Sequence, residues 1–260
     1  MKRHLIALAA TTAALAAPAI GHATTTSYVA VLKELNNSGV SGRVNFFVED
    51  SVLRVEADIR GLVPSLPHVN HIHGRFNEDG TPRKSLFPGT EQDIADAGFA
   101  VDGDGLAEVF EAAPLYGDVL LSLENPEPRP GMGNFHQGPV ADADGNLNYS
   151  YTFSLLDPDP TDATDDPFFS TVGGPDYQPS DIFPLDLREY VIHGAFVPGS
   201  TLNEGFSFVP GTERADGTGY SATLPVAAAQ ISAVPLPAGA LLLLTGLGGL
   251  GYVRKRRKAA

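Results

Sequence analysis

Alternation with a period of two residues is the feature that most limits the fold of this chain. In several short segments, every second side chain is apolar, as in strands that bury one face. The clearest of these segments are 42–47 (GRVNFF), 53–59 (LRVEADI), 147–153 (LNYSYTF), 189–192 (EYVI) and 220–224 (YSATL). The apolar run 119–123 fits a buried strand, and 107–113 favours one or two turns of helix. Together with abundant Gly and Pro for turns, the pattern predicts an all-β fold.

The two ends of the chain differ in composition from the middle. Residues 1–23 place Lys2 and Arg3 before an apolar stretch and end in small residues, as a signal peptide cleaved after Ala23 would. Residues 234–260 contain an apolar stretch of 16 residues, 238–253, followed by five basic residues. This order predicts a single C-terminal transmembrane helix whose basic end stays in the cytoplasm.

Residues 24–233 between these ends are expected to form one β domain. Within it, 156–180 is acidic and rich in Pro, which predicts a long surface loop. Residues 24–234 hold all 31 Asp and Glu against ten Lys and Arg, a net charge of −21. Such a domain repels nucleic acid, so no nucleic-acid partner is expected, and it attracts cations. The chain has no cysteine, which excludes disulfides and thiolate zinc sites.

Histidines form the main candidate for a metal site. His71 and His73 are two residues apart, so on a strand they point to the same face and can offer two imidazoles to one ion. His68 is an odd number of residues away from both, so on the same strand it would point to the opposite face. His193 follows an apolar strand segment and could supply a third ligand, and His136 is a further candidate. Copper and zinc are the metals that favour imidazole ligands. The alternative is that these imidazoles form hydrogen bonds within the sheet or lie exposed in loops.

An acidic segment is a weaker candidate for a calcium site. Asp102, Asp104 and Glu111 have the offsets of three ligands in an EF-hand loop, but Ala100 stands where the first aspartate is required. A polar turn is therefore the competing interpretation. A second such segment, 142–145, lacks the final glutamate and is expected to be a hairpin turn.

The C-terminal segment resembles a known class of sorting signal. Val234-Pro235-Leu236-Pro237-Ala238, the Leu/Gly span and the basic end are similar to the VPLPA variant of the PEP-CTERM signals. The resemblance implies that a membrane exosortase recognises and cleaves the tail and passes the protein to the cell surface. It implies an exported protein of the cell envelope, surface or exterior, anchored transiently in the inner membrane by this helix.

The middle of the chain resembles the CHRD (chordin) and copper–zinc superoxide dismutase domains. The resemblance follows the order of the segments: 39–46 and 53–62 look like the opening strands, His71-Ile72-His73-Gly74 like the copper pair and 136–145 like the exit of the zinc loop. Residues 188–194 look like the strand of the last copper histidine, and 219–227 like the closing strand. The resemblance implies a Greek-key β-sandwich or barrel with long loops, and copper or zinc held by His71, His73, His193 and His136.

The same comparison argues against dismutase activity. Between the two copper-binding segments the sequence has only His136, where that family has a bridging histidine, further histidines and an aspartate. The closing strand lacks the family's cysteine and its guiding arginine, and a charge of −21 repels superoxide. The sequence therefore favours a non-catalytic surface domain. A copper-dependent superoxide dismutase and a calcium-binding module of the envelope or matrix remain the alternatives.

Overall fold

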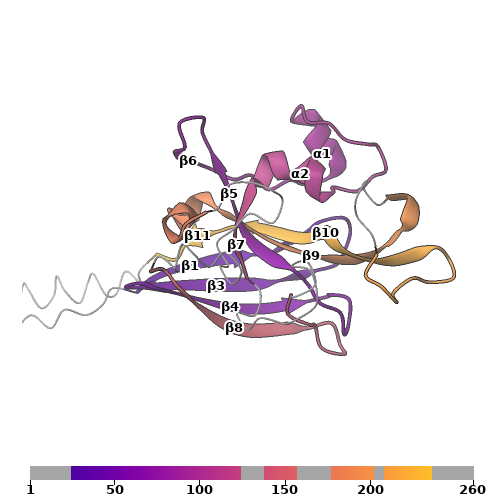
Figure 1. Ribbon diagram of the computed structural model, residues 1–260, viewed down its shortest axis with the longest axis horizontal. Coiled ribbons are helices and arrows are strands. Elements are labelled where there is room, and N and C mark those ends of the chain that lie inside the picture. The colour runs from indigo at the N-terminus through magenta and orange to yellow at the C-terminus, as the bar shows by residue number, and fades with distance from the viewer. Residues whose placement is uncertain (1–24, 124–137, 157–176, 202–207, 236–260) are drawn as a thin grey trace, which may run out of the picture.

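The computed structural model describes residues 25–123, 138–156, 177–201 and 208–235 (Figure 1). The all-β prediction is confirmed: the strands form two antiparallel sheets, and the helices are few and short. The expected signal peptide, transmembrane helix and His136 lie outside the described residues. Within the described ranges, no helix has the length and apolar character needed to cross a membrane.

The first sheet has five strands in the order β11-β1-β3-β4-β8. Its members are β1 (Thr26–Val31), β3 (Ser41–Glu49), β4 (Val52–Arg60), β8 (Leu147–Ser154) and β11 (Ser232–Ala233). In β4 the residues at 53, 55, 57 and 59 are buried and those between them are not, so the period of two read from the sequence is a one-sided strand.

The second sheet has the order β2-β10-β9-β5-β6, and β7 also pairs with β5. Its members are β2 (Lys33–Glu34), β5 (Asn70–Phe76), β6 (Pro82–Arg83), β7 (Asp118–Ser122), β9 (Glu189–Pro198) and β10 (Thr218–Gln230). Apolar side chains from both sheets form one core, which includes Phe46, Val55, Ile72 and Ile192. The core also contains a polar residue, Asn70, whose Oδ1 accepts a hydrogen bond of 2.6 Å from the hydroxyl of Tyr149.

Two helices cover the outer face of the second sheet. They are α1 (Glu91–Asp96) and α2 (Val109–Tyr116), and Figure 1 shows them on the side of β9 and β10 away from the first sheet. A second apolar cluster lies beneath them and includes Ile94, Leu115 and Val191. Because both faces of β5 and β9 are covered, most of their residues are buried, which alternation alone did not indicate.

The helix expected at 107–113 is present as α2, displaced by a few residues, whereas α1 was not expected. Its signal is a capping box in which Thr90 and Asp93 bond each other's backbone N–H groups. Short 3₁₀ helices complete the described helical structure, at Pro179–Ile182, Leu185–Leu187 and Gly199–Thr201.

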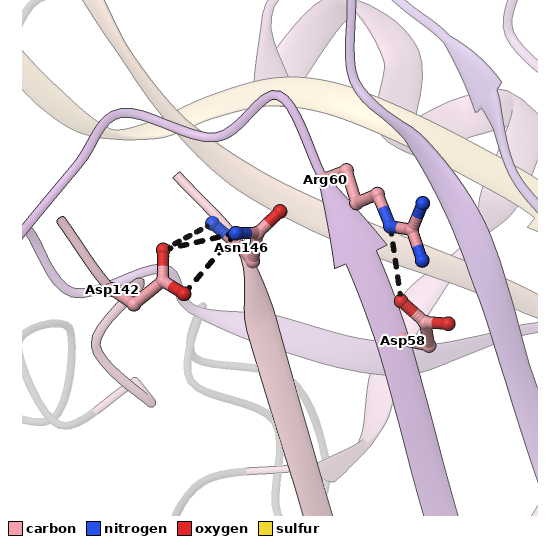
Figure 2. Close-up of polar contacts among 4 residues, drawn as sticks. All are labelled: Asp58, Arg60, Asp142 and Asn146. Atoms are coloured by element: carbon pink, nitrogen blue, oxygen red, sulfur yellow. Dashed lines mark hydrogen bonds and ion pairs between the residues drawn. The ribbon is translucent and has the colours of Figure 1, made fainter. Parts of the chain in front are cut away.

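The turn expected at 142–145 exists but does not join two strands of a hairpin. The Asp142 Oδ1 atom accepts the backbone N–H groups of Asp144 and Asn146, and the chain then enters β8. Figure 2 shows the contacts between Asp142 and Asn146. The residues before the turn form only an isolated bridge between Val140 and Pro67. Nearby, the exposed Arg60 and Asp58 form an ion pair of 3.4 Å at the end of β4 (Figure 2).

The segment 156–180, expected to be a surface loop, lies mostly outside the described residues. Its described end is packed rather than loose. The ring of Tyr177 stacks on Phe76 at a centroid distance of 5.5 Å, and its hydroxyl donates to Asp118 Oδ2 at 2.6 Å. A 3₁₀ helix begins at Pro179. Tyr177 therefore anchors the described end of this segment against β5 and β7.

Candidate metal centre

Three histidines meet on the face of the second sheet that α2 covers. Two of them, His71 and His73, come from β5, where Ile72 between them points into the core. The third, His193, comes from the neighbouring strand β9. One ligand atom from each ring lies within 4.8 Å of the other two. The structure thus brings together His71, His73 and His193, the three residues that their spacing and their places on strands had grouped in the sequence.

The cluster is buried, and each ring has a nitrogen that no hydrogen bond uses. The three side chains are at most 5 % exposed. The buried atoms His71 Nδ1, His73 Nε2 and His193 Nε2 have no hydrogen-bond partner among the described residues. A buried polar atom without a partner costs about 1–3 kcal/mol, so three of them at one point call for a ligand.

Backbone carbonyls hold the opposite nitrogens of two of the rings. The Nδ1 atom of His73 lies 2.9 Å from the carbonyl oxygen of Gly117, and Nδ1 of His193 lies 2.7 Å from that of Thr223. An N–H at each Nδ1 leaves the lone pair on Nε2, the atom that points into the cluster. A carbonyl that accepts from the second nitrogen is the usual support of a metal-binding histidine.

Both acceptors are available because of irregularities in the backbone. Gly117 ends α2 with φ 94°, and it follows the last turn of the helix. Thr223 lies in β10 where the pairing with β9 shifts register between Ser221 and Pro225. Proline cannot donate to a strand ladder, so Pro225 is a sequence signal for such a bulge. Neither Gly117 nor Thr223 had been identified from the sequence as part of the site.

The electrostatics keep the three rings neutral. Burial lowers the pKa of His73 to about 3 and that of His193 to about 4, and the charge of His193 adds to the effect at His73. Burial also lowers the pKa of His71 well below its usual value, with His193 and His73 contributing. A neutral imidazole is the form that ligates a metal, so no proton has to be displaced from these nitrogens at neutral pH.

The other two candidate histidines are not part of this cluster. Both nitrogens of His68 face carbonyl oxygens, that of His193 at 2.9 Å and that of Val63 at 3.0 Å. Its ring lies edge-on to Tyr220 at a centroid distance of 5.8 Å, so His68 packs beneath the strand that carries His193. His68 thus lies outside the cluster, but it precedes β5, so its parity on that strand is not the reason. His136 lies outside the described residues.

A pocket opens above the three imidazoles. It has a volume of about 70 Å³, and α2 contributes Val109, Phe110 and Ala113 to its wall. The ring of Tyr116 also borders it, and that ring lies edge-on to His73 at a centroid distance of 4.5 Å. A group bound by the three histidines would therefore face a small, largely apolar space.

The acidic candidates are arranged differently from an EF-hand loop. Asp102 and Glu111 lie close together with Glu91, whereas Asp104 groups with Asp102 and Glu108. The sequence did not indicate Glu91 or Glu108. The Glu91 carboxylate accepts the N–H groups of Gly103 and Gly105, and Glu111 accepts that of Asp102. Through these hydrogen bonds, Glu91 and Glu111 hold the backbone of the loop that contains Asp102. Calcium binding stays a prediction.

The chain matches no protein-family model and no curated protein. The function of the three-histidine cluster therefore has to be inferred from its own geometry and chemistry.

Proposed function

We propose that this protein binds one copper or zinc ion through His71, His73 and His193. The observation that carries the proposal is the convergence of three buried imidazole nitrogens, each without a hydrogen-bond partner among the described residues. The ligand atoms would be Nδ1 of His71 and Nε2 of the other two. Gly117 and Thr223 would orient His73 and His193 through the carbonyl oxygens already described.

Three neutral imidazoles suit Cu(II), Cu(I) and Zn(II), and Cu(II) should bind most tightly on intrinsic affinity. The rings start from neighbouring strands of one sheet, so β5 supplies a rigid half-site and β9 presents the third ring beside it. When bound, the metal would supply a Lewis-acidic centre with a position open towards the pocket.

For the domain as a whole, we propose a Greek-key sandwich of the CHRD and superoxide-dismutase type, exported and then sorted to the cell surface. The support for the fold is the order of the sequence segments, together with two facing antiparallel sheets. The support for export is the composition of 1–23 and 234–260. An exosortase-type enzyme and the inner membrane would be the partners of the tail.

A non-catalytic role fits this site better than superoxide dismutation. Among the described residues that line the pocket, none is a Lys or Arg that could guide an anion. The surrounding domain carries a net charge of −21, which lowers the local concentration of superoxide. We therefore propose metal binding as the function and treat dismutase activity as an outcome to be measured.

Metal analysis of the purified full chain tests this proposal. After exposure to copper and zinc and removal of free metal, we expect one ion per chain and, with Cu(II), an electron paramagnetic resonance spectrum with nitrogen hyperfine structure. His193→Ala should remove both signals. His68→Gln is the matched control, because this imidazole is as buried as the others but contacts carbonyls, and it should retain the ion. Equal metal content in the wild type and His193→Ala would contradict the proposal.

A further inference from the structure

We infer that the metal-facing pocket admits small uncharged ligands and rejects anions. The inference rests on the proposed function, since it concerns the position that the three histidines leave open. The ligand class is a neutral molecule of two or three heavy atoms with one donor atom, such as carbon monoxide, nitric oxide or dioxygen.

The size of the pocket favours a small ligand. Its volume is about 70 Å³. A cavity of about 150 Å³ lined by apolar side chains holds benzene, and one water molecule occupies about 30 Å³ of the liquid. The space above the histidines therefore suits a ligand of two or three heavy atoms, whereas a larger molecule would have to extend out of the pocket.

The lining of the pocket sets its polarity. Val109, Phe110 and Ala113 approach from α2, and Val69 and Val119 approach from the strand side. These side chains offer no hydrogen bond to a ligand, so a molecule that needs several hydrogen bonds loses them on entry. A ligand with an apolar body and a single donor atom loses little, and it removes apolar wall area from water.

The charges around the pocket act against an anion. Among the described residues that line it, Asp118 is the one with a charged side chain, and it is exposed. Its carboxylate is turned away from the histidines, because it accepts the hydroxyl of Tyr177 at 2.6 Å and Tyr177 packs on Phe76 in the core. An anion that approaches the metal therefore enters a domain with a net charge of −21 and has to leave water for a largely apolar wall. An uncharged ligand does not meet this barrier.

The helix residue Ala113 is the position from which access can be changed. It lines the pocket but is not one of the proposed ligands, and its side chain is partly buried. Ala113→Phe should fill the space over the histidines without removing a metal ligand. Phe110, which is 48 % exposed, forms another part of the wall, so Phe110→Ala should widen the pocket. Ala95→Phe on α1 is the matched control, because Ala95 is also partly buried and does not line the pocket.

Ligand titrations on the copper-loaded full chain test the inference. With Cu(I), carbon monoxide should give an infrared C–O band, and Ala113→Phe should weaken carbon monoxide binding by about tenfold or more, which is about 1.4 kcal/mol. Ala95→Phe should leave the band and the affinity unchanged. With Cu(II), azide at millimolar concentration should leave the electron paramagnetic resonance spectrum unchanged.

The copper content of each sample separates this inference from the proposed function. A sample without copper overturns both. A sample with one copper per chain but no C–O band, or with an azide-shifted spectrum, overturns only the ligand class. If Ala113→Phe does not fold, Phe110→Ala decides: it should bind tert-butyl isocyanide about tenfold more tightly than the wild type does. Equal binding of this bulky ligand by both proteins would contradict the role of the pocket wall.

Discussion

The Nδ1 atom of His73 lies 2.9 Å from the carbonyl oxygen of Gly117, so the end of a helix holds a histidine of the adjacent sheet. This contact joins α2 to the three-histidine cluster. It keeps the free lone pair of His73 on the nitrogen that faces His71 and His193. The conformation of Gly117 is therefore part of the site, although its own atoms would not touch the metal.

Replacing Gly117 by Ala should damage the fold and the site together. Gly117 has φ 94°, and a Cβ placed there would approach the carbonyl of Gly74 far inside contact distance. Strain of this kind costs about 1–3 kcal/mol, and the clash adds to it. Displacing the carbonyl that orients His73 should also lower copper affinity by about 10–100-fold. Urea unfolding and a copper titration measure the two effects.

Gly98→Ala is the control for this substitution. Gly98 has a similar φ of 89°, but no atom lies within 4 Å of the position that its Cβ would occupy. It should therefore show the cost of the backbone conformation alone and leave copper affinity unchanged. Equal losses of stability and of copper affinity in both variants would show that the close approach to Gly74 has no role.

The buried carboxyl of Glu189 should make metal-free stability depend on pH. Burial raises its pKa from 4.5 to about 8, against the opposing effect of Lys33 and Lys84. Because the folded state then binds a proton that the unfolded state releases, this group lowers stability as the pH rises from about 4.5 to about 8. Glu189→Gln removes the titration. The free energy of unfolding of the variant relative to the wild type should therefore increase between about pH 5 and pH 8.

Urea unfolding in the presence of a chelator, at intervals across that range, measures the difference. Using the difference between the two proteins cancels the titration of groups that both contain, the three histidines included. A difference that stays constant with pH would mean that Glu189 is ionised in the folded protein or is paired with a cation.

Removing the C-terminal tail after Pro235 should leave a folded domain. The last described pairing of the chain is β11 with β1, and the backbone N–H of Val234 donates to the carbonyl of Ser27 at 2.8 Å. A chain without residues 236–260 should therefore be soluble and melt cooperatively. A chain shortened further, without residues 232–260, loses β11 and should melt at a lower temperature. An insoluble product of the shorter deletion would show that the tail belongs to the fold.

The sequence was sufficient to predict several of the strands and the common face of two of the histidines, but it indicated no strand at β1. Alternation identified β3, β4 and β8, because each buries one face and exposes the other. The spacing of His71 and His73 gave their common face, since a strand has a period of two. The place of His193 at the end of an apolar strand segment indicated a third ligand.

The remaining features depend on contacts between distant parts of the chain. Gly117 and Thr223 are 44 and 30 residues from the histidines that they hold, and no local pattern marks a carbonyl as an acceptor. The burial of both faces of β9 follows from the helices above it, and α1, with only six residues, gives a weak periodic signal. The prediction of a hairpin at 142–145 was wrong. The side chain of Asp142 bonds the backbone of its own loop, and a turn of this kind forms whether or not a strand precedes it.

The central claim is that His71, His73 and His193 bind a metal in the folded state. Thermal and urea unfolding with and without Cu(II) test it most directly, on the full chain and on two variants, His73→Ala and His68→Gln. Binding to the native state alone should raise the free energy of unfolding by about 2.7 kcal/mol at a copper concentration one hundredfold above the dissociation constant. His73→Ala should lose this gain.

His68→Gln should be less stable than the wild type without metal, because the ring of His68 is buried and bonded to the carbonyls of Val63 and His193. It should nevertheless gain about the same free energy from copper. Unfolding curves that copper leaves unchanged in the wild type would contradict the claim and show that the three histidines are structural.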